Sequence, residues 1–433
     1  MTTYFTKVNT IIPRVGLINT GNTCFLNTAL QSLIQNPLIT HYFENRQEII
    51  ETVLKNTKRI LFETNGDPKP ITIGMDKEML QNIWNNAPST YSINEQANIL
   101  ARSISIALGD LIQVSREKNS VVVPLRFRKL FSCLRNNYFS NNDQHDSSEA
   151  YNCIIEAIQN ELYVGISSYK VHTDPSLDKL VKTVKSFKKA LKTGNFTDEQ
   201  KKHYENQYLE LKRKRLADFK LAEKLFGIEE IMRDSYSPFS HLSTVLENST
   251  ITCSKCEFSS STIGSNTQIN LSISKSQPTI YDCLDKYTGP EKLDGSNRWF
   301  CDNCGHAVDA TKKTDLLNLP KTISFVFSRF SNWGEKLDTN ISAPMTNLDM
   351  KKYLDPLNNK SQCYNYTLIS VIDHIGTHSR GHYYAKCLDL KTGFWNVFND
   401  EKVSPIRHSE VVSNIGYMFV YIRNDMIVDL TKS

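Results

Sequence analysis

Cys24 stands where a turn-rich polar stretch passes directly into a predicted helix. Asn19 and Gly21 precede it, and the apolar side chains after it recur at helical spacing until a stop signal at residues 36–37. Exposed backbone NH groups and the positive end of the dipole at a helix N-terminus favour a thiolate, the form of cysteine that attacks carbonyl carbon. We therefore expect a nucleophile, and the alternative is a buried cysteine that packs on a core helix.

The residues before Cys24 also offer a hydrogen-bond donor. Gly16 and Gly21 bracket Asn19, so the backbone can turn tightly and bring the Asn19 amide near the sulfur. One donor to the oxyanion of an acyl-transfer reaction typically raises the rate by about a hundred- to a thousand-fold. We expect Asn19 to supply this donor.

A thiol nucleophile needs a base and a third group that orients the base. His382 begins an alternating strand after a glycine-containing turn, and the next strand ends at Asn399 and Asp400. In an antiparallel hairpin with its loop at residues 389–393, the outer ends of the two strands are neighbours. Either Asn399 or Asp400 can therefore reach the imidazole.

Four further cysteines form two CxxC pairs, Cys253 with Cys256 and Cys301 with Cys304, and 44 residues separate the pairs. A two-residue spacer lets both sulfurs of a turn face one metal ion, and four thiolates complete a tetrahedral zinc site. Such a site leaves no open position, so we expect a structural Zn²⁺ and no catalytic cofactor. The long separation places the pairs at the ends of extended strands that meet in space.

The composition is that of a folded protein without a membrane span. The chain has 433 residues, of which 39% are hydrophobic, which suits a large core and two or three domains or subdomains. No apolar run reaches the about 20 residues that cross a bilayer, and the first residues lack the apolar core of a secretory signal. We expect a cytoplasmic or nuclear protein whose ten cysteines do not form a disulfide framework.

The pattern along the chain predicts an N-terminal tail, a helical part, a basic helical insertion and a strand-rich part. The expected boundaries are 1–13, 14–164, 165–235 and 236–428. Helices are predicted over 93–112 and 149–162, and strands of an antiparallel sheet over 267–273, 323–328, 366–371, 382–388 and 418–422.

The basic character of the chain belongs to one segment. Residues 178–224 contain fourteen Lys or Arg against seven Asp or Glu, whereas the whole chain has a net charge of +5. Apolar residues keep helical spacing on both sides of a break at 194–195, which predicts a charged helical hairpin. We favour a solvated helical insertion over a patch that binds nucleic acid or an acidic partner.

These blocks together resemble the ubiquitin-specific protease family of cysteine deubiquitinases. The matching blocks are residues 16–31, the acidic box 144–149, both CxxC pairs and residues 366–400, and they occur in the family's order. The resemblance implies an α+β fold with a papain-like core, described as a helical thumb, an antiparallel β palm and zinc-bearing β fingers.

The resemblance also implies a role for each matching residue. Cys24 is the expected nucleophile, His382 the general base, Asn399 the third member with Asp400 as a supporting or alternative partner, and Asn19 the oxyanion-hole side chain. The family often has Asp in the third position, and Asn can still accept a hydrogen bond from histidine but adds no charge.

The family binds the arginine-rich tail of ubiquitin through carboxylates, which here are Asp146 and Glu149. Without the resemblance, we would interpret these two residues as ordinary negative charges at a helix N-terminus. His374 and Tyr383 match positions that line a narrow passage for the terminal Gly-Gly.

The implied function is hydrolysis of the isopeptide or peptide bond after the C-terminal glycine of ubiquitin. The expected partners are ubiquitin and ubiquitinated proteins, with no membrane, and the expected state is a monomer. One alternative is a ubiquitin-binding scaffold of low activity. Another is a zinc-ribbon protein that binds nucleic acid through residues 178–224, which we disfavour because the aromatic residues there keep the spacing of packing residues.

Overall fold

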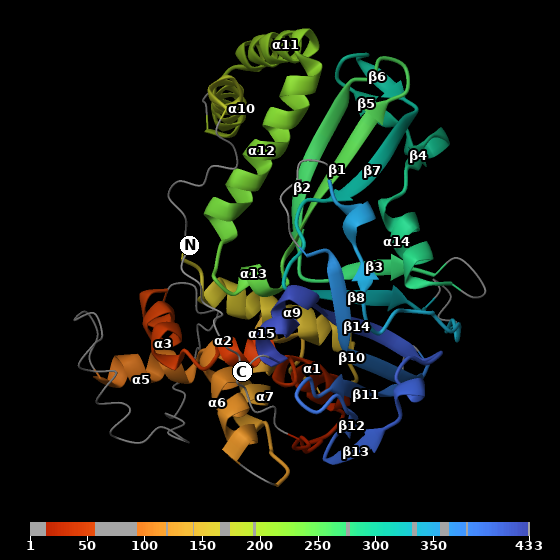
Figure 1. Cartoon of the computed structure of the whole chain (residues 1–433). Helices are drawn as coiled ribbons and strands as arrows, with labels where there is room; N and C mark the ends of the chain where they lie inside the picture. Colours follow the sequence, from red (N-terminus) through yellow and green to blue (C-terminus); the bar gives the residue numbers. More distant parts are fainter. Residues whose placement is uncertain are drawn as a thin grey trace.

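The computed structural model describes residues 14–56, 93–117, 120–141, 143–164, 174–193, 196–273, 278–330, 336–355, 363–377 and 380–431, and the predicted tail over 1–13 lies outside them. The fold is α+β, as expected. A helical unit packs against an eight-stranded sheet, a four-stranded sheet extends from one end, and three helices stand beside the four-stranded sheet (Figure 1).

The helical unit precedes residue 165. Its helices are α1 (Cys24–Ile34), α2 (Pro37–Tyr42), α3 (Arg46–Lys55), α5 (Ile93–Ala101), α6 (Ile104–Glu117), α7 (Leu125–Ser132), α8 (Leu134–Asn137) and α9 (Ser147–Glu161). The helical structure predicted over 93–112 is confirmed, with a break that separates α5 from α6. The carboxylate of buried Glu161 accepts hydrogen bonds from the Ser103 hydroxyl at 2.7 Å and the Ile104 NH at 2.8 Å, and so caps α6.

The eight-stranded sheet has the order β13-β12-β11-β10-β14-β8-β3, and β9 pairs with β10. The strands are β3 (Ile269–Ser272), β8 (Thr322–Ser328), β9 (Leu348–Asp349), β10 (Asn365–Gly376), β11 (Gly381–Leu388), β12 (Trp395–Asn399), β13 (Lys402–Ile406) and β14 (Gly416–Arg423). The expected antiparallel sheet is confirmed except that β3 and β8 are parallel. Parallel neighbours need a long crossover, which the chain between them provides by running through the second sheet.

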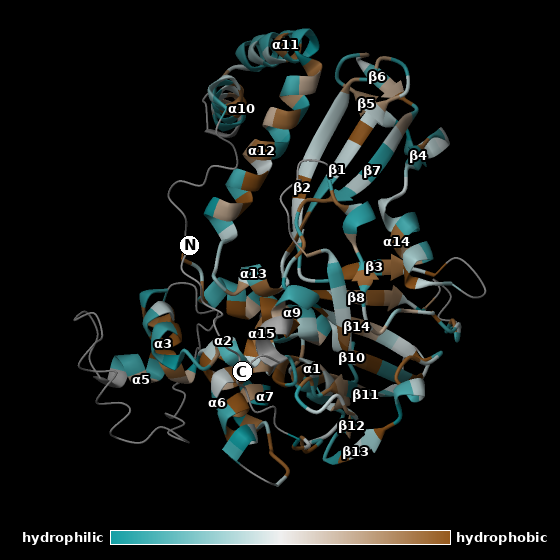
Figure 2. Cartoon of the chain, viewed as in Figure 1, coloured by the Kyte–Doolittle hydropathy of each residue, from teal (hydrophilic) through white to brown (hydrophobic). Residues whose placement is uncertain are grey.

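Helix α1 lies between the other helices of the helical unit and this sheet. All of its residues are buried, and Ser32 Oγ lies 2.8 Å from Ser370 Oγ of β10. Strand β8 is buried over all but its last residue and is coloured mostly as hydrophobic in Figure 2. Among the described helices, none alone has the length and apolar composition to cross a membrane. One pair, Glu95–Ala101 with Ile104–Glu117, meets these two criteria together, with a bend of 73° between the helices.

The second sheet carries the predicted cysteine pairs. Its order is β2-β1-β7-β4, with a separate β5-β6 hairpin at its tip. The strands are β1 (Val245–Cys253), β2 (Ser259–Asn266), β4 (Glu291–Leu293), β5 (Trp299–Cys301), β6 (His306–Val308) and β7 (Ala310–Leu316), and α14 (Ile280–Thr288) precedes β4. Cys253 ends β1 and Cys301 ends β5, as the spacing predicts.

The basic segment forms three helices. The predicted first arm and the break after it are confirmed, but the second arm of the predicted hairpin is wrong because it is divided in two. The three helices are α10 (Pro175–Thr193), α11 (Asp198–Lys214) and α12 (Leu216–Ser235), and the chain turns at Arg215 between α11 and α12. The aromatic residues pack together, as expected: the rings of Phe187 and Tyr208 stack at 3.9 Å, and Tyr208 meets Phe219 edge-on at 5.6 Å.

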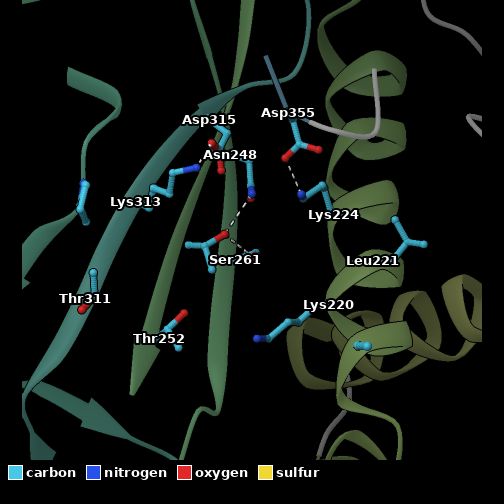
Figure 3. Close-up of a pocket in the computed structure, with 13 residues that line it drawn as sticks. Lys220, Leu221, Lys224, Asn248, Thr252, Ser261, Thr311, Lys313, Asp315 and Asp355 are labelled. Carbon is cyan, nitrogen blue, oxygen red and sulfur yellow. Dashed lines mark hydrogen bonds and ion pairs between the residues drawn. The ribbon is translucent and has the colours of Figure 1, made fainter. Parts of the chain in front are cut away.

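Helix α12 runs along the four-stranded sheet. Gly227 allows close approach to β2, because a Cβ there would lie 2.4 Å from Ile263 Cγ1. Before Gly227 in the chain, between the first half of α12 and the strands, there is a hollow of about 560 Å³ (Figure 3). Its wall carries the ion pair Lys224–Asp355 at 2.6 Å, and none of the predicted catalytic residues line it.

Candidate active site

The segment before Cys24 is fixed by hydrogen bonds to its backbone. On α1, the side-chain amides of Asn27 and Gln31 donate to the carbonyls of Leu17 at 3.2 Å and Val15 at 2.9 Å. Asn27 was not predicted as a site residue. Its position three residues after Cys24 and four before Gln31, as a polar residue on the same side of the helix, is the signal that could have identified it.

Asp400 positions the predicted oxyanion-hole amide. Its carboxylate accepts from Asn19 Nδ2 at 2.9 Å and from Asn27 Nδ2 at 2.8 Å. Asn19 Oδ1 accepts from the NH groups of Gly21 and Thr23 at 3.0 and 3.1 Å, so both ends of the amide are held. Asp400 has a φ of 50°, a left-handed conformation that Asp tolerates better than most residues and that turns its side chain toward α1.

His382 and Asn399 form the predicted pair. His382 Nε2 lies 2.7 Å from Asn399 Oδ1, and the amide oxygen can only accept, so Nε2 carries the hydrogen and Nδ1 is the free basic nitrogen of the neutral ring. Asp400, the alternative partner, bonds to Asn19 and Asn27 instead.

Cys24 is 3% exposed at the first position of α1. Burial raises the pKa of its thiol above the ordinary value, and a hydrogen bond from the Tyr383 backbone opposes this shift. The backbone NH groups of Phe25 and Cys24 at the helix start lower the pKa, in the direction expected, but burial has the larger effect. Among the described residues, no hydrogen bond joins the Cys24 sulfur to His382.

Asp146 caps α9 and also faces the site. Oδ1 accepts from the NH groups of Ser148 at 2.7 Å and Glu149 at 3.0 Å, which is the helix-capping role that its position predicts. Oδ2 accepts from the hydroxyls of Tyr417 at 2.5 Å and Tyr383 at 3.4 Å. Burial and the nearby carboxylate raise the pKa of both tyrosines, so both remain donors.

Two neighbouring contacts were not predicted. Gln144 Oε1 accepts from the Gly381 NH at 2.7 Å, which joins the loop before α9 to the strand that carries His382. Glu149 pairs with Arg135 at 2.8 Å. Neither contact has a local sequence signal, because the Gln144 bond spans 237 residues and Arg135 lies on another helix.

His374 and Tyr383 are opposite each other on β10 and β11, with ring centroids 4.4 Å apart. Gly381 makes room for the His374 ring, because a Cβ there would lie 2.1 Å from Nε2. His374 is 3% exposed, and burial together with the charge of Lys336 lowers its pKa to about 4. This histidine is therefore neutral at ordinary pH.

The four predicted metal ligands meet at the tip of the second sheet. Cys253 Sγ is 3.9 Å from Cys304 Sγ, and Cys256 Sγ is 3.7 Å from Cys301 Sγ, and all four sulfurs lie within 4.8 Å of one another. A tetrahedral ion with metal–sulfur bonds of about 2.3 Å would place its ligands about 3.8 Å apart. The donor set and its spacing therefore fit a metal ion of this geometry.

The turn between α11 and α12 packs against this cysteine cluster. Leu209 and Leu216 border the small core formed by Cys253, Phe258, Cys301 and Val308. Lys212 is 4% exposed, and its Nζ lies 4.6 Å from the Phe258 ring centroid and 2.8 Å from the Glu223 carboxylate. A lysine that sequence reasoning assigns to a solvated face is thus buried in the contact.

A cysteine at a helix start, a histidine–asparagine pair and an anchored amide define a thiol hydrolase of the cysteine-peptidase class. The profile of the family described as ubiquitin carboxyl-terminal hydrolase matches residues 15–421, and the chain belongs to this family.

Three relatives show how far the similarity extends. The probable ubiquitin carboxyl-terminal hydrolase R319 of Acanthamoeba polyphaga mimivirus is 30% identical over 95% of this chain and 90% of its own length. Ubiquitin carboxyl-terminal hydrolase 2 of Bos taurus is 24% identical over 94% of this chain and 54% of its own length. Ubiquitin carboxyl-terminal hydrolase 15 of Rattus norvegicus is 36% identical over a match that covers 34% of this chain and 15% of its own length.

We predict that His374 makes the fold sensitive to acid. Its folded-state pKa of about 4 is below the ordinary 6.5, so the unfolded chain takes up the proton first as the pH falls. The stability contributed by the neutral ring is complete above pH 6.5 and is lost toward pH 4, by up to about 3 kcal/mol at about 1.4 kcal/mol per unit. Urea unfolding at pH 7.5 and 5.0 should show a larger loss for the wild type than for His374→Gln. Equal losses in the two proteins would contradict the assignment.

Proposed function

We propose that this chain is a thiol-dependent deubiquitinase that hydrolyses the peptide or isopeptide bond after the C-terminal glycine of ubiquitin. The observation that carries the proposal is the hydrogen bond from His382 to Asn399, because the neighbouring residues Tyr383 and Asp400 bond to the Cys24 sulfur and to the Asn19 amide. Membership of the family supplies the substrate class. The proposed fold is the papain-like thumb, palm and fingers arrangement, with boundaries at 14–164, 165–235 and 236–428.

The first half-reaction acylates Cys24. Because burial keeps the sulfur a thiol, His382 Nδ1 takes its proton as the sulfur attacks the glycine carbonyl carbon. The carbonyl oxygen becomes an oxyanion, which the second hydrogen of Asn19 Nδ2 stabilises while the first remains on Asp400. The C–N bond then breaks, and the imidazolium protonates the leaving amine.

The second half-reaction releases ubiquitin. His382 removes a proton from water, whose oxygen attacks the thioester carbon and forms a second oxyanion at the Asn19 amide. The C–S bond breaks, the sulfur regains its proton from His382, and the product leaves with a free carboxylate. Asn399 keeps the ring oriented throughout.

Shape and charge around Cys24 support selection of the ubiquitin tail. The His374 and Tyr383 rings and the Gln144–Gly381 bond narrow the passage beside the sulfur, which suits a Gly-Gly end without side chains. Asp146 and Glu149 provide the carboxylates for the basic residues upstream of it.

We propose that the four-cysteine site holds Zn²⁺. Zinc accepts four thiolates in tetrahedral geometry, and Cys253, Cys256, Cys301 and Cys304 would hold it with no position left for substrate. Bound there, it would stabilise the tip of the second sheet.

The Cys24→Ala variant tests the proposed function. We expect it to lose all measurable cleavage of ubiquitin carrying a C-terminal fluorogenic amine, while binding to immobilised ubiquitin is retained, because the sulfur is the nucleophile and not a packing group. Cys133→Ser, at an exposed cysteine, is the matched control and should remain fully active. Normal cleavage by Cys24→Ala would overturn the proposal.

We expect Asp400 to affect catalysis by positioning Asn19. We expect Asn19→Ala to lower kcat about a hundred- to a thousand-fold with little change in KM, since the donor acts on the oxyanion. Asp400→Ala should lower kcat less, because Gly21 and Thr23 still hold the other end of the Asn19 amide. If Asp400 acts through Asn19, the double variant is no slower than Asn19→Ala alone. Independent, multiplicative losses would show a separate role for Asp400.

Metal analysis tests the zinc proposal. We expect one zinc per chain by elemental analysis, and both loss of metal and a lower melting temperature in Cys256→Ser and Cys304→Ser. Cys363→Ser, outside the cluster, is the control and should keep its zinc. A metal-free wild type, or a cluster variant that keeps its zinc, would reject the assignment.

A further inference from the structure

An exposed apolar patch adjoins the catalytic segment. Leu17 pairs with Val122 in a parallel bridge, and both side chains are buried. Side chains alternate along such a pairing, so the residues on either side face outward. Ile18 is 37% exposed, Val121 39% and Val123 48%. Leu125, the first residue of α7, extends this surface and is 49% exposed.

Hydrogen bonds hold the two segments of the patch together and join them to the turn before Cys24. The Ile18 NH donates to the Val122 carbonyl at 2.9 Å, and the Val122 NH donates to the Gly16 carbonyl at 3.0 Å. From α7, Arg128 donates to the Thr20 carbonyl at 2.7 Å, so the segment behind the patch is tied to the turn that precedes Cys24. A ligand seated on the patch would therefore rest against the frame of the catalytic loop.

The position of the patch separates it from the groups assigned to the ubiquitin tail. Those groups lie at the start of α9 and on the β10–β11 hairpin. The patch segment instead contacts the β12–β13 turn, because the Leu17 NH donates to the Asp400 carbonyl at 2.9 Å. The link between α6 and α7 and the β12–β13 turn lie at the end of the molecule away from the four-stranded sheet, and this link is coloured as hydrophobic in Figure 2.

We infer that this patch docks the protein on the leaving-group side of the scissile bond, through an apolar surface of that protein. The inference rests on the proposed function. An acceptor lysine spans roughly 6 Å from Cα to Nζ, so the surface that carries it must approach the catalytic loop closely. Ile18 directly precedes the Asn19 donor, so the patch borders the catalytic loop. Exposed apolar side chains grouped on a rim are typical of a protein-binding surface.

Two substrates that differ only beyond the scissile bond test the inference. We expect the double variant Val123→Ser/Leu125→Ser to lose about tenfold in kcat/KM on the di-ubiquitin linkage that the wild type cleaves fastest, because apolar contact area is lost. On ubiquitin with a small fluorogenic amine, the same variant should stay within twofold of wild type. Leu211→Ser on α11, where Leu211 is also 49% exposed, is the matched control and should not separate the two substrates.

Each other outcome counts against the inference. Equal losses on both substrates would assign the patch to the fold or to the chemistry, and unchanged di-ubiquitin cleavage would leave it without a docking role. A wild type that is dimeric by light scattering, and a double variant that is monomeric, would assign the patch to self-association. Failure of the wild type to cleave either substrate would reject the proposed function itself and is distinguishable from all of these.

Discussion

The site depends on the junction between the β12–β13 turn and the segment that leads into α1. Asp400 contributes twice to this junction: its carbonyl accepts from the Leu17 NH, and its carboxylate accepts from the amides of Asn19 and Asn27. Hydrogen bonds to a carboxylate are stronger than neutral ones. Because Asn399 directly precedes Asp400, the same turn sets the partner of His382, the proposed base, and the position of Asn19, the proposed oxyanion donor. A shift of this turn would disturb both, although the groups they serve are more than 350 residues apart in the chain.

Much of this arrangement could be predicted because its signals are local. Helical spacing after Cys24, each single CxxC motif and the alternation around His382 lie within about a dozen residues, and the corresponding helix and strand ends are where they were expected. Asn27, Gln144 and Tyr417 could not be assigned in this way, since their partners are distant in sequence. The choice between Asn399 and Asp400 needed the backbone conformation of the turn, which pattern alone does not contain.

Local reasoning failed where burial outweighs a local effect. The dipole at a helix N-terminus is worth about 0.3–1 kcal/mol at an exposed site, whereas burial can shift a pKa by several units. Cys24 is buried, so its pKa rises and the base has to create the nucleophile. Lys212 shows the same limit, because a basic helix predicts a solvated lysine, yet the Glu223 carboxylate and the Phe258 ring offset the cost of burying this one. The insertion therefore contacts the core around the cysteine cluster partly through Lys212, a residue that composition alone would place in water.

The carboxylates of the site are engaged within the protein itself. Asp146 already accepts from two backbone NH groups and two tyrosine hydroxyls, and Glu149 is paired with Arg135. A cationic tail that binds here must compete with Arg135 and shares Asp146 with the N-terminus of α9, so charge alone gives a limited gain. The close packing of the His374 ring against Gly381 does not depend on charge, so no other ion competes with it. The two residues cannot move apart unless the pairing of β10 with β11 breaks. The proposed selection by shape therefore has stronger support from the packing of these residues than the proposed selection by charge has from the carboxylates.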